Sequence, residues 1–291
     1  MPREDSLTPE GITGDALADT LASIADSEPL VHHLTNEVTM SETANVTLCW
    51  NGLPVMADAP AEAGEMAAGA DAVLCNTGRM TEEDVGAMIA AGESANDVGA
   101  PVVLDPVGYG ATSFRVSAVD RILEAVDVAV IKGNRGEIAG LAGEAASVRG
   151  VESVGEHDSI GPAARALADE TGAVVVASGE TDVVATAERA YELAVGDERM
   201  GTFVGSGCML GSTLATFAST LGDGDAPPAT ATDAAILAVI AFGFAGERAA
   251  DAPGVAGPAS YRTAFIDAVA ALARERPTLP VRDRIRALDR E

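Results

Sequence analysis

The chain has 291 residues, 47% of them hydrophobic, and a formal net charge of −27. That length and apolar content are enough for one large α/β domain. The acidic residues are spread along the whole chain, so the charge belongs to its surface and would repel a nucleic-acid backbone almost everywhere. We therefore expect no nucleic-acid partner.

Arginine strongly outnumbers lysine, and Lys132 is the only lysine among the 18 lysine and arginine residues. Such a surplus of acid is typical of a cytoplasm with very high salt, where counterions screen the self-repulsion, so we expect a halophilic protein. The three cysteines show no CxxC spacing, and the first residues have no apolar signal-peptide core. Both features favour a cytoplasmic location. The apolar run Ala234–Gly246 is too short to span a bilayer and predicts a buried helix, so we expect no membrane contact.

The N-terminal part of the sequence predicts a tail followed by a helix, a strand, a second helix and a second strand. Residues 1–10 are expected to be loose, and apolar residues at helical spacing predict a helix over Asp15–Ala25. A strand within Pro29–Val38 comes next, and then a helix at 39–50 and a strand at 52–57. Asn36 at the strand exit either points its amide into a cleft or closes a turn. His32 and His33 are neighbours on one strand, so they face opposite sides and are expected to be structural.

Two buried strands with polar exits are predicted at 72–78 and 101–108, with a helix from Thr81 to about Val98 between them. A third strand, Val126–Ile131, runs into Lys132. Strands that alternate with helices at this spacing predict a parallel sheet wound on both faces. Ligands of such sheets bind at the carboxyl ends of strands. Four polar residues occupy such ends: Asn36, Asn76, Asp105 and Lys132.

The second half begins with an acidic connector at 144–162, followed by a helix near 163–169 and a strand at 173–179. A small antiparallel hairpin, at 182–185 and 191–194, is predicted at a mixed edge of the sheet. A turn-rich break at 222–228 and closing helices at 231–250 and 258–273 complete the pattern. There is no internal repeat and no linker, so we expect a single domain.

The segment 201–213 is predicted to run from a strand exit through glycines into a helix. Gly205 and Gly207 let backbone N–H groups approach an anion, and a helix that starts there directs its positive dipole end at phosphate. Cys208 falls in the first turn of that helix, where thiol pKa values are commonly lowered. The alternative is a glycine-rich turn that merely starts a core helix.

Lys132 and Glu137 form the other pair of chemical interest. One lysine at a strand end, in a chain that avoids lysine, indicates a nucleotide phosphate site. Asn134 and Glu137 are three residues apart and are expected to face one cleft, where a carboxylate could hold Mg²⁺ directly or through waters. Asp105 is a second candidate metal ligand. The alternative is that Glu137 only serves the dipole of its own helix. Neither a GxGxxG fingerprint after the first strand nor a GxxxxGK[ST] loop is present.

Taken together, these motifs resemble the hydroxyethylthiazole kinase family of the ribokinase-like superfamily. The similar stretches fall in family order between about residues 15 and 270: His33-Leu-Thr-Asn-Glu-Val38, Pro54-Val-Met-Ala57, Asn76-Thr-Gly78, Leu104-Asp-Pro-Val-Gly-Tyr-Gly-Ala-Thr112, Ile131-Lys-Gly-Asn-Arg-Gly-Glu137, Ser178-Gly-Glu-Thr-Asp182, Gly205-Ser-Gly-Cys208 and Gly257-Pro-Ala-Ser260. The combination of Asp-Pro-Val-Gly with Gly-x-Gly-Cys is specific to the family, since most other members of the superfamily carry Asp in place of this Cys.

The resemblance implies a three-layer α/β/α fold with a mostly parallel central sheet, usually assembled as a homotrimer with active sites between subunits. It implies transfer of the γ-phosphoryl group of ATP to the hydroxyl of 5-(2-hydroxyethyl)-4-methylthiazole with Mg²⁺, in thiamine salvage. By matching position, the thiazole would contact Met56, Asn36 and Gly205, with Cys208 beside the alcohol as the catalytic residue. ATP would bind Lys132 and Ser178, and Mg²⁺ would bind Asp105 and Glu137.

Two departures from the family pattern stand out, because the family commonly has Arg at the position of Lys132 and Thr at that of Ser178. Lysine gives up bidentate phosphate contacts, whereas serine keeps the hydroxyl. Two other functions stay open at this point. One is a related kinase for another small alcohol, such as a hydroxymethylpyrimidine or a sugar, and the other is a catalytically idle binding subunit that keeps the pocket.

Overall fold

The computed structural model describes residues 12–143, 148–149, 152–153, 160–221, 228 and 230–288. The expected loose tail at 1–10 lies outside the described residues, as do most of the connector 144–162 and most of the break 222–228. The elements follow one another as α1 (Gly14–Ser27), β1 (Leu30–Leu34), α2 (Met40–Cys49), β2 (Leu53–Val55), α3 (Ala63–Ala67), β3 (Ala72–Asn76), α4 (Glu82–Val98), β4 (Val102–Asp105), α5 (Ser113–Ala125), β5 (Val130–Asn134), α6 (Arg135–Leu141), β6 (Val148–Arg149), β7 (Glu152–Ser153), α7 (Gly161–Thr171), β8 (Val174–Ser178), β9 (Asp182–Ala185), β10 (Ala190–Leu193), η1 (Glu198–Thr202), α8 (Ser206–Ala218), α9 (Ala231–Ala250), α10 (Pro258–Glu275), η2 (Arg282–Arg284) and β11 (Ile285–Leu288).

The main sheet of the described chain has the strand order β11-β10-β9-β8-β5-β4-β3-β1-β2. Its pairs are parallel from β8 through to β2. The strands β9, β10 and β11 continue it with antiparallel pairs. The predicted mostly parallel sheet and the predicted hairpin at a mixed edge are both confirmed.

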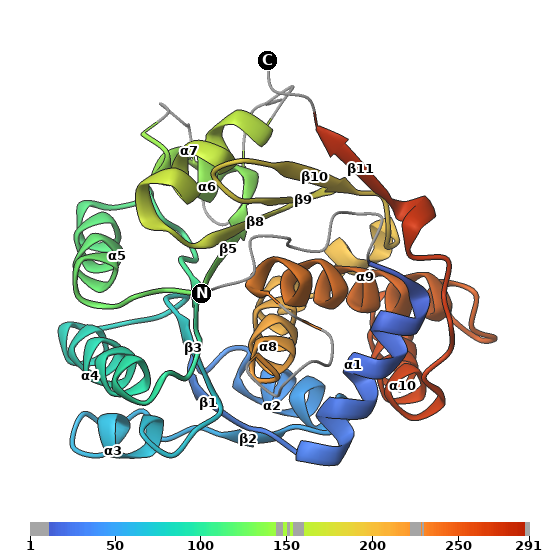
Figure 1. The fold of residues 1–291 in the computed structure, drawn as a ribbon, viewed down its shortest axis with the longest axis horizontal. Coiled ribbons are helices and arrows are strands. Elements are labelled where there is room, and N and C mark those ends of the chain that lie inside the picture. The colour runs from blue at the N-terminus through green and yellow to red at the C-terminus, as the bar shows by residue number, and fades with distance from the viewer. Residues whose placement is uncertain are drawn as a thin grey trace.

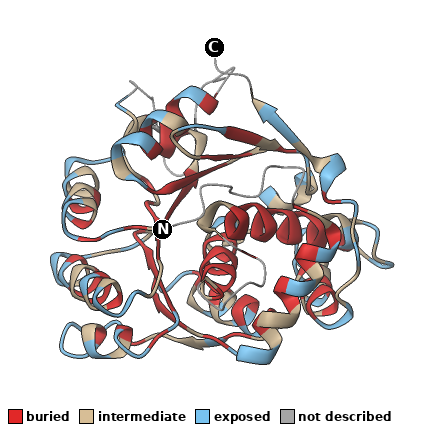
Figure 2. Ribbon diagram, in the orientation of Figure 1, coloured by how far each residue is buried: buried red, intermediate tan, exposed pale blue. Residues whose placement is uncertain are grey.

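Helices cover both faces of this sheet, which confirms the expected three-layer arrangement (Figure 1). The helices α3 to α7 pack on one face, and α1, α2, α8, α9 and α10 pack on the other. Successive residues of a strand face opposite sides of the sheet. In β3, Val73 and Cys75 pack in the hydrophobic core on the side of α3 to α7, and Ala72 and Leu74 pack in the core on the side of α8. Strands that are buried on both faces read as continuous apolar runs, which is why the sequence pattern located them (Figure 2).

Local signals set several helix boundaries. The α4 helix begins with a capping box in which Thr81 Oγ1 accepts the Asp84 N–H and the Asp84 carboxylate accepts the Thr81 N–H. The α9 helix is buried along most of its length, as the apolar run Ala234–Gly246 predicts. No helix in the described part of the chain is long and apolar enough to cross a membrane.

His32 and His33 are fully buried and project to opposite faces of β1, as predicted. His32 Nε2 lies 2.9 Å from the carbonyl oxygen of Ala57, and His33 Nδ1 lies 2.9 Å from that of Val31. Burial lowers the pKa of His32, and it lowers the pKa of His33 to about 4. Both rings are therefore neutral parts of the structure at neutral pH.

Two expectations were wrong in their details, and one strand was missed. The strand β5 covers Val130–Asn134 and not Val126–Ile131, because Val126 still caps the end of α5. The glycine segment does not leave a strand, since the 3₁₀ helix η1 and three further residues precede α8. The strand β11 had no sequence signal: its four residues include an arginine, and it forms by pairing with β10, far away in the chain.

Candidate active site

The polar residues predicted at strand ends lie in one row along the sheet. The carboxyl ends of β2, β1, β3, β4, β5 and β8 are neighbours in this order. The residues near these ends are, in the same order, Met56, Asn36, Asn76, Asp105, Lys132 and Ser178. Lys132 lies two residues before the end of β5, and the others lie at a strand end or one or two residues past it. In β3, β4 and β5 the site residues share a sheet face with Leu74, Val103 and Val130, which is the face covered by α8.

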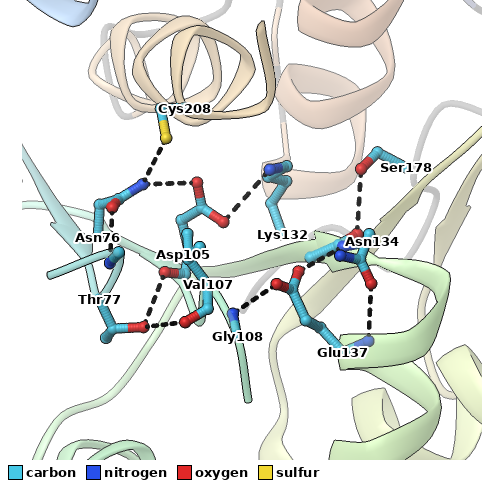
Figure 3. A network of polar contacts seen from close by, with 12 residues as sticks. Asn76, Thr77, Asp105, Val107, Gly108, Lys132, Asn134, Glu137, Ser178 and Cys208 are labelled. Carbon is cyan, nitrogen blue, oxygen red and sulfur yellow. Dashed lines mark hydrogen bonds and ion pairs between the residues drawn. The ribbon is translucent and has the colours of Figure 1, made fainter. Parts of the chain in front are cut away.

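A buried ion pair forms the centre of the row. Lys132 Nζ lies 3.2 Å from Asp105 Oδ1, and the two residues are 4% and 0% exposed (Figure 3). Burial by itself lowers the pKa of Lys132, but the neighbouring carboxylates of Asp105 and Glu137 outweigh it, so the net shift is upward. Lys132 is therefore a cation at neutral pH. The sequence predicted a phosphate contact for Lys132, and the structure shows in addition that its ammonium is paired with a carboxylate.

Asn76 connects this ion pair to Cys208. Its Nδ2 donates to Asp105 Oδ2 at 2.8 Å and to Cys208 Sγ at 3.3 Å (Figure 3). Its Oδ1 accepts from Asn36 Nδ2 at 2.9 Å and from the Gly78 N–H at 3.0 Å. An amide with two donors and two occupied acceptor sites is held in one orientation. The sequence analysis placed Asn76 at a strand end but did not predict that it hydrogen-bonds to several other residues of the site.

Asn36 closes a turn, which is one of the two roles that the sequence left open, and it also contacts two other residues of the site. Its Oδ1 accepts the Thr39 N–H at 3.2 Å and so closes the turn into α2. Its Nδ2 points to Asn76 and lies 3.7 Å from Cys208 Sγ. The two asparagines thus direct amide N–H groups at one sulfur atom.

Cys208 lies in the first turn of α8, at a helix start that carries no side-chain cap in the described chain. The N-cap is Gly205, whose φ of 98° is in the left-handed region that favours glycine. The first N–H groups of a helix have no partner within it, and the dipole adds positive potential there. This helix start is therefore suited to an anion such as phosphate.

The thiol of Cys208 does not show the lowered pKa expected from its position. Burial raises the pKa of Cys208 and the Asp105 carboxylate adds to the rise, while Lys132 and the asparagine amide oppose it. The sequence reveals the helix start but not the buried carboxylate beneath it. Cys208 is therefore a protonated thiol at neutral pH in the free protein.

Two glycines on one side of α8 let the helix lie directly on the ion pair. A Cβ atom at Gly207 would lie 3.1 Å from Lys132 Nζ, and one at Gly211 would lie 3.3 Å from Asp105 Oδ2. The two positions are four residues apart and so share one face of the helix. This spacing was the available signal for Gly211, which sequence reasoning missed.

Glu137 lies in a capping box at the start of α6 and so does serve its own helix. Its N–H donates to Asn134 Oδ1, and its Oε2 accepts the Asn134 N–H at 2.7 Å. Its Oε1 accepts the Gly108 N–H at 2.6 Å, which ties α6 to the loop after β4. Asn134 and Glu137 thus face each other across the cap.

The carboxylates of Asp105 and Glu137 fit a hydrated cation better than a direct metal cage. Among the described residues no three His, Cys, Asp or Glu side chains gather to hold a metal ion. Two buried carboxylates, Asp105 and Glu137, share the one ammonium of Lys132, and burial, followed by the charge of Asp105, raises the pKa of Glu137 to about 6. Each oxygen of Glu137 accepts one N–H and keeps a lone pair for a water. Mg²⁺ usually keeps several waters and binds through one or two carboxylates plus substrate phosphates.

The residues at the two ends of the row, Ser178 and Met56, make fewer polar contacts than those at its centre. Ser178 Oγ donates to the Gly133 carbonyl at 3.3 Å, so its hydroxyl sits beside β5 at the end of β8. Met56 is half-buried, one residue past β2. Gly205 lies against α2, where a Cβ would come within 3.1 Å of Thr39 Cγ2.

Comparisons with known proteins agree with this arrangement. Residues 21–275 match the model of the hydroxyethylthiazole kinase family. A hydroxyethylthiazole kinase from Natronomonas pharaonis is 48% identical over 261 residues, covering 89% of this chain and 92% of that protein. The structure of a hydroxyethylthiazole kinase protein from Pyrococcus horikoshii OT3 has a TM-score of 0.78 and 32% identity, over 94% of this chain and 100% of that chain. A ribokinase-like superfamily protein from Enterococcus faecalis V583 shares the fold, with a TM-score of 0.63 and 11% identity over 91% of this chain and 95% of its own.

Proposed function

This chain belongs to the hydroxyethylthiazole kinase family, and from that premise we propose that the cluster under α8 is where it transfers phosphate. The protein is a kinase, it uses ATP, and it phosphorylates hydroxyethylthiazole. The observation that carries the proposal is the chain of contacts from Lys132 through Asp105 and Asn76 to Cys208, directly beneath the uncapped start of α8. A kinase for a hydroxymethylpyrimidine or another alcohol is not favoured by the family match.

The transferring phosphoryl group is proposed to lie over the start of α8. Phosphoryl transfer needs positioning and charge neutralisation more than covalent chemistry. The N–H groups of the Gly205–Cys208 turn would hold phosphate oxygens, as an anion hole does. Lys132 Nζ lies under Gly207, so its charge acts on the same place from the sheet side. Ser178 would bind ATP from the end of β8.

The alcohol is proposed to lie on the β1 side of this helix start. Met56, Asn36 and Gly205 would hold the thiazole, and Cys208 would face the hydroxyl. Asn36 and Asn76 direct N–H groups at the sulfur and so fix its position. Cys208 is proposed as the catalytic residue, and the small fraction of it in the thiolate form would accept the alcohol proton as the phosphoryl group passes from ATP to the alcohol oxygen.

Mg²⁺ is proposed as the cofactor, held by Asp105 and Glu137 through water and by the phosphates of ATP. When bound, it supplies charge neutralisation for the phosphate oxygens. The structural support is the surplus of buried carboxylate, two groups against one ammonium, in which Glu137 has its pKa raised to about 6.

A coupled assay that follows ADP tests the proposed reaction. The protein, with ATP and Mg²⁺ in molar KCl, should phosphorylate 5-(2-hydroxyethyl)-4-methylthiazole and act much more weakly on a hydroxymethylpyrimidine. Omitting Mg²⁺ in the presence of a chelator should abolish the signal. Equal rates on the two alcohols, or full activity with the chelator, would contradict the substrate or the cofactor.

A homotrimer is proposed as the assembly, with the sites near subunit contacts. Two large apolar side chains beside the site are exposed in the single chain: Val38 at 67% and Val204 at 71%. Val38 follows Asn36 by two residues, and Val204 precedes Gly205. Exposed apolar groups at such a place are typical of a contact with another subunit.

The cytoplasm with high salt is proposed as the protein's environment. All three cysteines are free thiols, which suits a reducing compartment. The net charge of −27 on one domain must be screened for the chain to stay compact.

A KCl series tests the assembly and the salt adaptation together. The thermal unfolding midpoint should rise between low and molar KCl, because counterions screen the self-repulsion. Light scattering in molar KCl should give the mass of three chains. A midpoint that stays flat or falls would contradict the halophilic adaptation, and a monomer mass would contradict the trimer.

A further inference from the structure

The last residue pair of the β3–β4 ladder carries the two central side chains of the site. Asn76 and Asp105 are register partners at the carboxyl ends of their strands. Beyond this pair, the segments that follow β3 and β4 leave the sheet as separate loops. The Thr77 N–H joins the two loops by donating to the Asp105 carbonyl at 3.0 Å. The contact between the Asn76 amide and Asp105 therefore depends on how these loops are held.

Arg115, from the first turn of α5, binds backbone carbonyls of both loops. Its Nη1 donates to Thr77 O at 2.6 Å and to Val107 O at 2.7 Å, and its Nη2 donates to Gly78 O at 2.9 Å. The planar guanidinium thus donates several hydrogen bonds to both loops and connects them beyond the end of the β3–β4 ladder. The backbone at Gly108, with φ of 74°, runs beside the Arg115 side chain, because a Cβ there would lie in van der Waals contact with it, at 3.4 Å.

The three carbonyls are directly connected to groups of the site. Thr77 and Gly78 follow Asn76, and the Gly78 N–H donates to Asn76 Oδ1 at 3.0 Å. Val107 precedes Gly108, whose N–H donates to Glu137 Oε1 at 2.6 Å. The same guanidinium is therefore linked through these loops to the Asn76 amide and to Glu137.

We propose that Arg115 is a positioning residue for phosphoryl transfer, which holds the ends of β3 and β4 at the spacing that lets Asn76 bridge Asp105 and Cys208. The role of those side chains rests on the proposed function above. The carbonyls are in a partly exposed region, so water can replace the guanidinium at modest cost in stability. Water molecules cannot fix the relative position of the two loops, so removing Arg115 is expected to lower kcat more than it lowers stability.

Kinetics of Arg115→Met and Arg115→Lys, with Arg121→Met as the control, test this role. Arg121 lies on the same helix but is exposed and pairs with Glu82 at 2.8 Å, a kind of ion pair that contributes little. We expect kcat to fall about tenfold in Arg115→Met, within the range that a displacement of about 1 Å costs. The kcat of Arg115→Lys should lie between those of Arg115→Met and the unsubstituted protein, because an ammonium keeps the charge and three N–H donors but lacks the planar fork that reaches both loops. KM for both substrates and the unfolding midpoint should change little, and Arg121→Met should match the unsubstituted protein.

Two readouts separate positioning from a general loss of structure. Guanidinium at tens of millimolar should partly restore kcat in Arg115→Ala, whereas equal KCl should not. Hydrogen exchange at the amides of Thr77 and Gly108 should speed up in Arg115→Met and not in Arg121→Met, whether or not the protein turns over. An unsubstituted protein without kinase activity would refute the proposed function and leave the exchange result to decide the role of Arg115. A kcat of Arg115→Met equal to that of Arg121→Met, or unchanged exchange, would overturn the positioning role.

Discussion

Replacing Lys132 with methionine should raise the KM for ATP by about 10- to 100-fold, because one charge-assisted contact of about 1.5–3 kcal/mol is lost. Lys132 is the only lysine of the chain, and its Nζ lies 3.2 Å from Asp105 Oδ1 and beside Gly207 in the first turn of α8. Steady-state kinetics with varied ATP measure the effect. Lys132→Arg is the matched control, since it keeps the charge, and its KM should stay within a few-fold. An unchanged KM in the methionine variant would place Lys132 outside the nucleotide site.

The same substitution should also destabilise the protein, by about 3–5 kcal/mol if Asp105 stays ionised, because it leaves a buried carboxylate without its cation. The double variant Lys132→Met with Asp105→Asn removes both charges and should be more stable than Lys132→Met alone. Denaturant unfolding of the single and double variants separates this effect from ATP binding. A double variant as unstable as the sum of its singles would show that the two charges do not act as a pair.

Replacing Cys208 with alanine should lower kcat on the order of 10²-fold, the lower limit for a group that transfers a proton. The KM for ATP should change little, because the backbone N–H groups at the start of α8 remain. Cys208→Asp should keep substantial activity, since a carboxylate is a competent base. Equal losses in the two variants, or none in alanine, would show that this side chain is not the catalytic group.

The pH dependence of kcat gives an independent check on Cys208. Burial raises the pKa of the thiol above its usual range, so the thiolate fraction is small at neutral pH and grows up to tenfold with each pH unit. If the thiolate accepts the proton, kcat of the unsubstituted protein rises between pH 7 and 9. The rise should be weaker in Cys208→Asp, whose carboxylate ionises at lower pH. Parallel profiles would contradict proton transfer to Cys208.

The sequence was enough to predict the sheet and the row of polar residues at its edge. Buried parallel strands are apolar throughout and end in polar residues, so Asn76 and Asp105 could be placed from local pattern alone. The order of the strands then brought them together, because the carboxyl ends of parallel strands share one edge. Motif resemblance added the residues that have no periodic signal, such as Met56.

The contacts among these residues could not be predicted, because they depend on distant segments. The pairing of Lys132 with Asp105 and the raised pKa of Cys208 both result from the buried carboxylate lying under α8. The strand β11 forms only against β10, about ninety residues earlier in the chain, since Leu193 pairs with Ile285. Arg115 gave no signal in the sequence, where it is one arginine at the start of an ordinary helix.

The row of strand ends has a consequence for the design of inhibitors. Met56 and Ser178 stand at opposite ends, five strand spacings apart from β2 to β8, which is about 24 Å at the usual spacing. The two substrates are thus proposed to approach the start of α8 from opposite sides and to meet end to end. A single molecule that joins a thiazole to adenosine through a phosphate chain would occupy both halves at once. Once one half is bound, the other is held at a millimolar effective concentration, so such a molecule should bind far more tightly than either substrate.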